Sequence, residues 1–314
     1  MSKRQRVIAL GFFDGVHLGH GALLRAVQRK AEELGLPAAV MSFDAHPGTL
    51  VSGKAVPMIN TTEDRVWLMQ HYYRIDEVIL AHFDEAMMHM PWRSFVTDYL
   101  IGTLGAAYVV CGRDFRFGDR GAGDARRLRD ACAELGVGCE VVDMVSVDGV
   151  QVHSTVIRQL LAEGRMEEAN RCLGHPHTLI QTVNPGKHLG SRLGFPTVNL
   201  TIPPEVAVPA YGVYTTKVYL DADDDATAQI AVTNVGVRPT VDSSGTVTVE
   251  GYILDFHGNL YGKRVRMEFF RHLRGERRFD SVEALTAEVL RNAEQTRQYF
   301  AAEGCVSGGQ DYGR

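Results

Sequence analysis

The sequence is poor in cysteine and has no long hydrophobic run. Five of its 314 residues are cysteine, and no two of them have the C-x-x-C spacing, so neither a disulfide framework nor a zinc site is indicated. No stretch of about 18 apolar residues is present, which argues against a transmembrane helix. The apolar segment at residues 7–10 is too short for a signal peptide. We therefore expect a protein of the reducing cytoplasm that does not associate with membranes.

An excess of basic residues is also missing. The chain has 33 lysine and arginine residues against 38 aspartate and glutamate residues, a net charge of −5, which argues against a dedicated nucleic-acid surface. Hydrophobic residues make up 45% and charged residues 23%, the balance of a globular protein rather than a disordered or collagen-like chain. We expect no nucleic-acid partner, and a monomer or a weak homo-oligomer.

The two halves of the sequence have different patterns. In the first half, short apolar runs alternate with helical periodicity, which is typical of βαβ units and a mostly parallel sheet. The second half is richer in Gly, Pro, Thr and Val, and its short strand-like segments predict a barrel or a sandwich, followed by a helix capped by Asp280 and Glu283. The length suits two domains of roughly 100–200 residues, and we predict them at 1–175 and 176–303, with a flexible tail at 304–314.

The predicted elements of the first half are strands at 7–10, 38–43, 78–81, 107–111 and 139–143, and helices at 19–34, 61–73, 91–102, 122–135, 155–163 and 166–173. Those of the second half are strands at 212–220, 230–235, 247–254 and 264–269. The acidic run at 221–225 is interpreted as a solvated hairpin tip, with a metal site as the alternative.

A glycine-rich segment, residues 11–20, lies between the first predicted strand and the first predicted helix. In an open α/β sheet, ligands bind at this position, where the helix N-terminus favours phosphate. Its glycines allow a tight turn, and His17 and His20 are spaced to donate to the same phosphate. Two surface histidines in a glycine-rich turn are the structural alternative. The other residues predicted to bind ATP here are Gly11, Phe13, Asp14, Gly15 and Gly19.

Two further segments are expected to contribute to the same pocket. Residues 112–118 follow a predicted strand and offer a carboxylate, two guanidinium groups and two aromatic rings. Residues 153–158 begin a helix, where hydroxyl groups can cap the helix and bind a phosphate, and an arginine follows one turn later. A charged loop and simple helix capping are the alternatives. The predicted ligand-binding residues are Asp114, Arg116, Ser154, Thr155 and Arg158.

A second polar group lies in the C-terminal half. Thr197 and Asn199 are two residues apart on an extended segment, so both face the same side, and their oxygens can reach a Mg²⁺ held between phosphates. A polar strand edge is the alternative. Upstream, a glycine-rich segment with one lysine could form a flap over a triphosphate. The residues expected in this flap are Gly186, Lys187 and Gly190.

Together, these segments resemble the bacterial bifunctional riboflavin kinase/FAD synthetase family over about residues 1–300. The His-x-Gly-His pattern at residues 17–20 is similar to that of the nucleotidyltransferase superfamily, and Pro-Thr-Val-Asn at 196–199 resembles the kinase PTxN motif. The resemblance implies a Rossmann-like N-terminal domain that transfers AMP from ATP to FMN, releasing pyrophosphate. It also implies a C-terminal β-barrel, closed by a helix, that phosphorylates riboflavin with ATP. Mg²⁺, ATP, riboflavin and FMN are the implied metal and substrates.

The same resemblance implies roles for three further residues. Glu250 is placed as the general base that removes the proton of the riboflavin 5′-hydroxyl, with His17 and His20 as the catalytic residues of the other reaction. Asn234 and Arg274 lie in segments similar to ligand-binding segments of the kinase module. The sequence departs from the family pattern at Ala45, His153 and Val198.

Two other functions are compatible with parts of this pattern. A nucleotidyltransferase with another acceptor would use the barrel only for specificity, but the pairing of the PTxN motif with Glu250 argues against it. A non-enzymatic flavin-binding protein would not need the intact polar sets of both halves.

Overall fold

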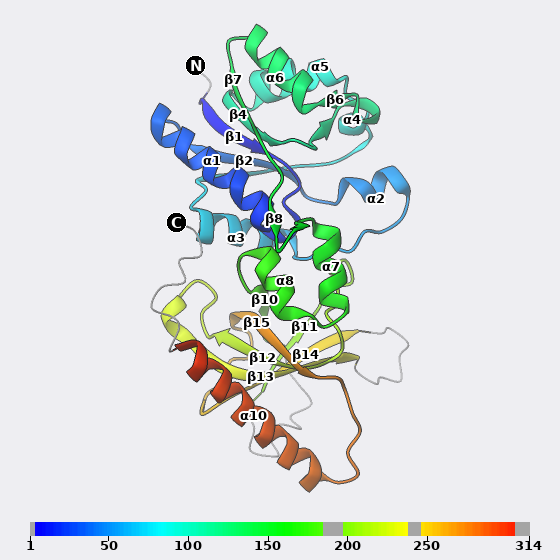
Figure 1. Cartoon of the computed structure of the whole chain (residues 1–314), viewed down its shortest axis with the longest axis vertical. Coiled ribbons are helices and arrows are strands. Elements are labelled where there is room, and N and C mark those ends of the chain that lie inside the picture. The colour runs from blue at the N-terminus through cyan, green and yellow to red at the C-terminus, as the bar shows by residue number, and fades with distance from the viewer. Residues whose placement is uncertain (1–3, 185–196, 238–245, 305–314) are drawn as a thin grey trace. The chain divides into compact units, whose positions relative to one another are not determined.

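The computed structural model (Figure 1) describes residues 4–184, 197–237 and 246–304. The chain forms two compact units. Unit 1 contains residues 4–58 and 65–154, and unit 2 contains residues 59–64 and the described residues from 155 onward. In the described part of the chain, no helix is both long enough and apolar enough to span a membrane.

Unit 1 is built on a five-stranded parallel sheet with the strand order β3-β2-β1-β4-β7. Residues 7–10 of its central strand are all buried, as expected for a parallel sheet that is covered on both faces. The sheet confirms the predicted α/β fold. Its strands are β1 (Arg6–Leu10), β2 (Ala38–Phe43), β3 (Glu77–Ala81), β4 (Ala106–Gly112) and β7 (Gly138–Val142).

Most helices of unit 1 match the sequence pattern. Helix α1 (Leu18–Leu34) buries one apolar face, and the predicted helix at 91–102 begins as α5 (Trp92–Ser94) and continues as a π-helix over Phe95–Thr103. Helices α2 (Pro47–Ser52) and α4 (Glu85–Met88) are not predicted, because such short segments show no periodicity. Also present are α3 (Thr62–Tyr73), α6 (Ala125–Glu134), the 3-10 turns Asp14–Val16 and Asp119–Gly121, and the small strands β5 (Arg116–Phe117) and β6 (Gly123–Asp124).

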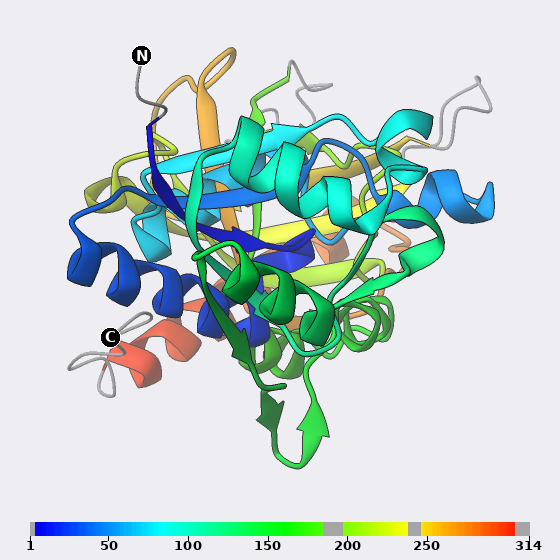
Figure 2. The ribbon, with the colours of Figure 1, turned by 90° about the horizontal axis from the view of Figure 1, so that it is seen from above.

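A small hairpin of unit 1 projects away from its sheet (Figure 2). It consists of β8 (Ser146–Val147) and β9 (Val150–Gln151). Asp148 and Gly149 form its tip with φ angles of 52° and 80°, the left-handed conformations that tight two-residue hairpin turns require.

Unit 2 is built on a six-stranded antiparallel sheet with the order β10-β15-β12-β13-β14-β11. The Asn184 N–H, just beyond β10, donates to the Asn199 carbonyl of β11 at 2.9 Å, so the two outer strands meet and the sheet closes toward a barrel. This confirms the predicted C-terminal fold. The strands are β10 (His177–Thr182), β11 (Thr197–Thr201), β12 (Gly212–Tyr219), β13 (Ala228–Val237), β14 (Val247–Ile253) and β15 (Arg264–Arg274).

Helix α10 (Val282–Gly304) lies along β12 and β13 (Figure 1). Its Ala293 packs into an apolar cluster with Val213 and Val232 of the sheet. The predicted capping by Asp280 and Glu283 is wrong: the Ser281 hydroxyl accepts the Ala284 N–H at 3.1 Å, so the helix begins one residue later than predicted.

Two shorter helices, α7 (Ser154–Ala162) and α8 (Met166–Leu173), precede the barrel. The Asn170 amide donates to the Phe269 carbonyl at 2.7 Å and accepts the His177 N–H at 2.8 Å. These bonds tie α8 to both β15 and β10. Both helices belong to unit 2, apart from Ser154, the first residue of α7, which belongs to unit 1.

The acidic run at 221–225 lies between β12 and β13, as expected for a hairpin connection. Two of its carboxylates form ion pairs, so the run is more than a solvated tip. Asp223 forms an ion pair with Arg264 at 3.1 Å, and Asp225 pairs with the buried Arg266.

Candidate active sites

The loop after β1 has an unusual backbone. Phe13 and Val16 have φ angles of 60° and 43°, and Gly15 has 77°; left-handed conformations are costly for residues other than glycine. The Phe13 ring is fully buried and lies so close to Gly11 that a Cβ there would be 3.0 Å from Phe13 Cε2. The ring therefore anchors the loop, and only the Phe13 backbone is available to a ligand.

The two predicted histidines lie together at the N-terminus of α1. His17 caps the helix, because its Nδ1 accepts the His20 N–H at 3.3 Å, and the two rings stack with centroids 3.6 Å apart. Burial lowers the pKa of His20 well below its usual value, and the neighbouring His17 and Arg65 lower it further. A neutral ring still donates one N–H. The buried Nδ1 of His20 has no hydrogen-bond partner among the described residues.

Arg65 of α3 packs against this loop through Phe12 and is not predicted from the sequence. Its guanidinium is 1% exposed, donates to the carbonyls of Phe12 and Phe43 and to the Ser42 hydroxyl, and lies 4.3 Å from the Phe12 ring centroid. Burial lowers its pKa to about 10, so it stays charged at neutral pH. The sequence did contain a signal for its burial, because Arg65 lies three residues before the apolar Leu68 and therefore on the same helix face. The structure buries both residues.

The segment at 112–118 leaves the sheet beside this loop, because Leu10 of β1 pairs with Cys111 of β4. Its Phe115 and Phe117 rings stack at 5.5 Å. Arg116 is largely exposed and lies 3.9 Å from Asp124, and it lines an open groove of about 360 Å³ toward β7 and α6. The Asp114 carboxylate lies against Gly112. The groove also contains Arg113, Arg126 and Arg129, together with Asp124 and Asp143.

Ser154 connects the start of α7 to the same loop. Its hydroxyl donates to the Asp14 carbonyl at 3.0 Å, and Asp14 is 2% exposed. In the first turn of α7, Arg158 donates to the Thr155 hydroxyl at 3.3 Å. The histidine pair, Asp14 and Ser154 therefore form one group in unit 1.

The second predicted group is assembled by strand register. Glu250 of β14 is directly opposite Asn199 of β11 on one side and Asn234 of β13 on the other. Asn234 in turn pairs with Val213, and Val213 with Arg274 of β15. Directly opposite residues project from the same face, so Asn199, Glu250, Asn234, Val213 and Arg274 form one line, which we name the cross-strand row.

The cross-strand row lies on the outer face of the barrel, on the side that α10 covers. The alternate residues Val198, Leu200 and Val249 are buried in the apolar interior. Asn199 is 7% exposed and its amide donates to the Thr197 hydroxyl at 3.5 Å, which leaves the amide oxygen as an acceptor. Hydroxyl and amide oxygens are ligands that suit Mg²⁺. The flap residues Gly186, Lys187 and Gly190 lie outside the described residues.

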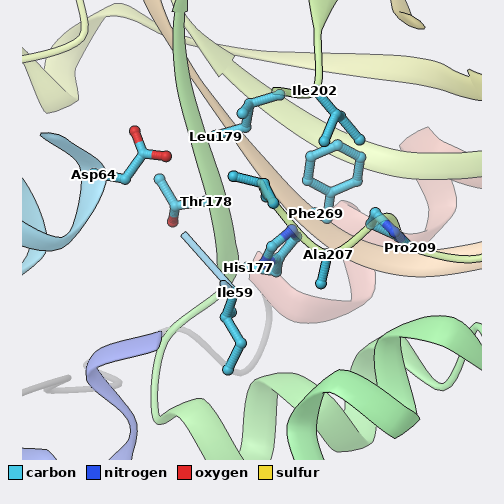
Figure 3. Close-up of a pocket in the computed structure, with 10 residues that line it drawn as sticks. Ile59, Asp64, His177, Thr178, Leu179, Ile202, Ala207, Pro209 and Phe269 are labelled. Carbon is cyan, nitrogen blue, oxygen red and sulfur yellow. The ribbon is translucent and has the colours of Figure 1, made fainter. Parts of the chain in front are cut away.

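A buried polar cluster occupies the opposite, inner side of unit 2 (Figure 3). Asp64 and His177 line a cavity of about 10 Å³ together with Leu179 and Phe269. The Asp64 carboxylate accepts the N–H groups of Ile180 at 3.1 Å and of Thr61 at 3.2 Å. Burial raises the pKa of Asp64 to about 7 and lowers that of His177 to about 4. None of the residues that line this cavity belongs to the cross-strand row.

Family models match both halves of the chain. A model described as FAD synthetase matches residues 1–156, and one described as riboflavin kinase matches residues 173–300. A relative from Listeria monocytogenes is 33% identical over 301 residues, which cover 94% of this chain and 93% of the relative. One from Escherichia coli is 32% identical over 295 residues, 94% of this chain and 92% of the relative. Both relatives are described as bifunctional riboflavin kinase/FMN adenylyltransferase.

A solved structure also matches nearly the whole chain. It is described as a macrolide-efflux protein from Streptococcus pneumoniae and has a TM-score of 0.81 at 27% identity, over 95% of each chain. That description refers to the other protein. The likeness supports the arrangement of strands and helices within each unit.

Proposed function

Because the chain belongs to the family of bifunctional riboflavin kinase/FMN adenylyltransferases, it converts riboflavin to FMN and FMN to FAD, and we propose which residues perform each step. The FAD synthetase match covers all the described residues of unit 1, and the riboflavin kinase match lies within unit 2. We place the division between the catalytic domains near residue 175, although the contacts of α7 and α8 group them with the barrel. The tail predicted at 304–314 lies outside the described residues, apart from Gly304, which is the last residue of α10.

For the kinase step, Glu250 is the general base that takes the proton of the riboflavin 5′-hydroxyl. Phosphoryl transfer depends mainly on positioning and charge neutralisation. The Thr197 hydroxyl and the Asn199 amide oxygen would hold Mg²⁺, which neutralises charge on the ATP phosphates. Asn234 and Arg274 bind substrate from the same row, and Gly186, Lys187 and Gly190 cover the phosphates. The observation that supports this set is the register that aligns Asn199, Glu250 and Asn234 on one face.

For the adenylyl step, a phosphate oxygen of FMN attacks the α-phosphorus of ATP and pyrophosphate leaves. The ring N–H groups of His17 and His20 stabilise the negative charge that develops there, and the N-terminus of α1 contributes its dipole. The loop of Gly11, Phe13, Asp14, Gly15 and Gly19 supplies backbone donors. Asp114, Arg116, Ser154, Thr155 and Arg158 bind the rest of the nucleotides.

We also propose that the enzyme acts in the cytoplasm, as a monomer or a weak homo-oligomer, and has no nucleic-acid partner. Its partners are then the small molecules riboflavin, FMN and ATP. The net charge of −5 supports the absence of a nucleic-acid partner.

Glu250→Gln tests the assignment of the general base. ADP release with riboflavin should fall by about a thousandfold, within the range for loss of a general base, while FAD formation from supplied FMN continues. Glu205→Gln, at an exposed position of the same unit, is the control and should leave both rates unchanged. Wild-type ADP release by Glu250→Gln would contradict the assignment.

A further inference from the structure

A buried carboxylate on α10 forms ion pairs with three arginines. Glu288 is 5% exposed. Its Oε1 lies 3.2 Å from Arg274 Nε, and its Oε2 lies 3.0 Å from both Arg277 Nη2 and Arg291 Nη1. A carboxylate that is so deeply buried requires charged partners, but one arginine would be enough to neutralise it.

The cluster therefore has an excess of positive charge. Three guanidinium groups against one carboxylate give a net charge of +2, in a chain whose total charge is −5. Arg274 is further held by Asn292, whose amide oxygen accepts from its Nε at 3.3 Å and from its Nη2 at 3.2 Å. The like charges repel each other, and an anion bound beside them would relieve that repulsion.

The cluster lies at the end of the cross-strand row. Arg274 is the last member of that row, and the connection from β15 to α10 bends back over it. Glu276 in this connection approaches Gly236 so closely that a Cβ there would lie 2.1 Å from its Oε1, and 3.3 Å from Asn234 Nδ2. The positive cluster and the polar row therefore share one face.

Arg274 and Arg277 both retain donors for a ligand. A guanidinium has five N–H groups. In the described structure Arg274 uses its Nε and Nη2 on Asn292 and one Nη1 hydrogen on the Gly275 carbonyl, which leaves two. Arg277 is about half exposed, contacts Glu288 through Nη2 and lies 4.7 Å from the Phe279 ring centroid, which orients its plane.

We propose that Glu288 is a positioning residue of the kinase site, which holds Arg274 and Arg277 so that their remaining N–H groups bind a phosphate group. The ligand is a phosphate carried by ATP or by the product FMN. Planar guanidinium pairs suit phosphate oxygens. The inference rests on the proposed placement of the kinase site on the cross-strand row.

Glu288→Gln tests the proposal with little change of shape. ADP release reports the kinase step alone, because adenylylation releases pyrophosphate. We expect about a tenfold rise in either the KM for ATP or the inhibition constant of FMN, the loss typical of a charge-assisted hydrogen bond, with the KM for riboflavin within twofold. A rise for ATP identifies an ATP phosphate, and a rise for FMN identifies the product phosphate. Glu283→Gln, exposed on the same helix, should change none of the three constants.

A second variant separates positioning from simple packing. In Glu288→Gln/Asn292→Asp, the carboxylate moves one helical turn, to the residue that already contacts Arg274, so most of the lost affinity should return. If Glu288→Gln does not fold, Arg277→Gln removes a half-exposed donor and should weaken the same phosphate ligand.

Three results would overturn the proposal: no change in either constant, an equal rise in the KM for riboflavin, or no recovery in the double variant. These results leave the Glu250 assignment intact if Glu250→Gln lowers ADP release by about a thousandfold. Wild-type ADP release by Glu250→Gln would instead contradict the placement of the whole kinase site.

Discussion

The two proposed active sites of this enzyme are assembled in different ways. In unit 1, one short loop and the start of one helix bring His17 and His20 together, and the backbone of that loop is held in left-handed conformations. In unit 2, the aligned residues come from five strands and are up to 75 positions apart, from Asn199 to Arg274. The first site therefore depends on local strain and buried support, and the second on correct strand register.

The electrostatics of the two sites also differ. His20 is kept neutral by burial and by nearby positive groups, with the charged Arg65 enclosed beneath it. In unit 2, Glu250 is exposed and the arginines gather around the buried Glu288. We infer that the histidine pair of the adenylyl site stabilises charge as neutral hydrogen-bond donors, whereas the arginines around Glu288 in the kinase site carry full charges.

The largest expected effect concerns the local site. His17→Ala/His20→Ala removes both ring donors, so FAD formation from FMN should fall by about a thousandfold, while ADP release with riboflavin stays within twofold because unit 2 is unchanged. Discontinuous assays of both products measure this. His89→Ala, exposed and bonded to Asp119, is the control. An equal loss of both rates in a folded variant would count against separate sites.

The support beneath the loop gives the next largest effect. Arg65→Met leaves the Phe43 carbonyl without its guanidinium donor and removes the bonds to Phe12 and Ser42, so the free energy of unfolding of unit 1 should fall by about 3 kcal/mol. Chemical denaturation measures this change. Arg29→Met breaks only an exposed ion pair with Glu140 and should cost less than about 1 kcal/mol. Equal effects would mean that Arg65 does not hold the loop.

The smallest expected effect is a pH dependence of unit 2. The pKa of Asp64 is raised to about 7 from an ordinary 3.8, so its contribution to stability is complete below pH 3.8 and is lost as the pH rises through 7. The pKa of His177 is lowered to about 4 from 6.5, so its contribution is present above pH 6.5 and is lost as the pH falls toward 4. The two contributions oppose each other.

Asp64→Asn should therefore leave the pH dependence contributed by His177 unopposed. Between pH 4 and 6.5, the Tm of unit 2 should rise more steeply with pH than in the wild type. The corresponding difference in the slope of the free energy of unfolding is at most about 1.4 kcal/mol per pH unit. Scanning calorimetry across this range measures the slope, and Glu205→Gln should leave it unchanged. An unchanged slope in Asp64→Asn would show that the Asp64 pKa is not raised.

Local patterns in the sequence predicted the fold, and they also placed His17 and His20 together at the start of one helix, where the structure has them. The strands of unit 1 and the His-x-Gly-His turn were visible because each depends on neighbouring residues. The alignment of the cross-strand row could not be predicted, because the register between distant strands leaves no local pattern in the sequence. Glu250 was proposed only from the resemblance to the family. Arg65 and Glu288 were missed for another reason: charged residues in helices are usually exposed, and only tertiary packing buries these two.

The most direct test of two separate sites is complementation. Glu250→Gln and His17→Ala/His20→Ala proteins are each incubated with riboflavin, ATP and Mg²⁺, alone and mixed, and the flavins are separated by chromatography. The first alone should leave riboflavin unchanged, the second alone should stop at FMN, and the mixture should produce FAD, because each protein supplies the module that the other lacks. A mixture of folded proteins that forms no FAD would contradict this account.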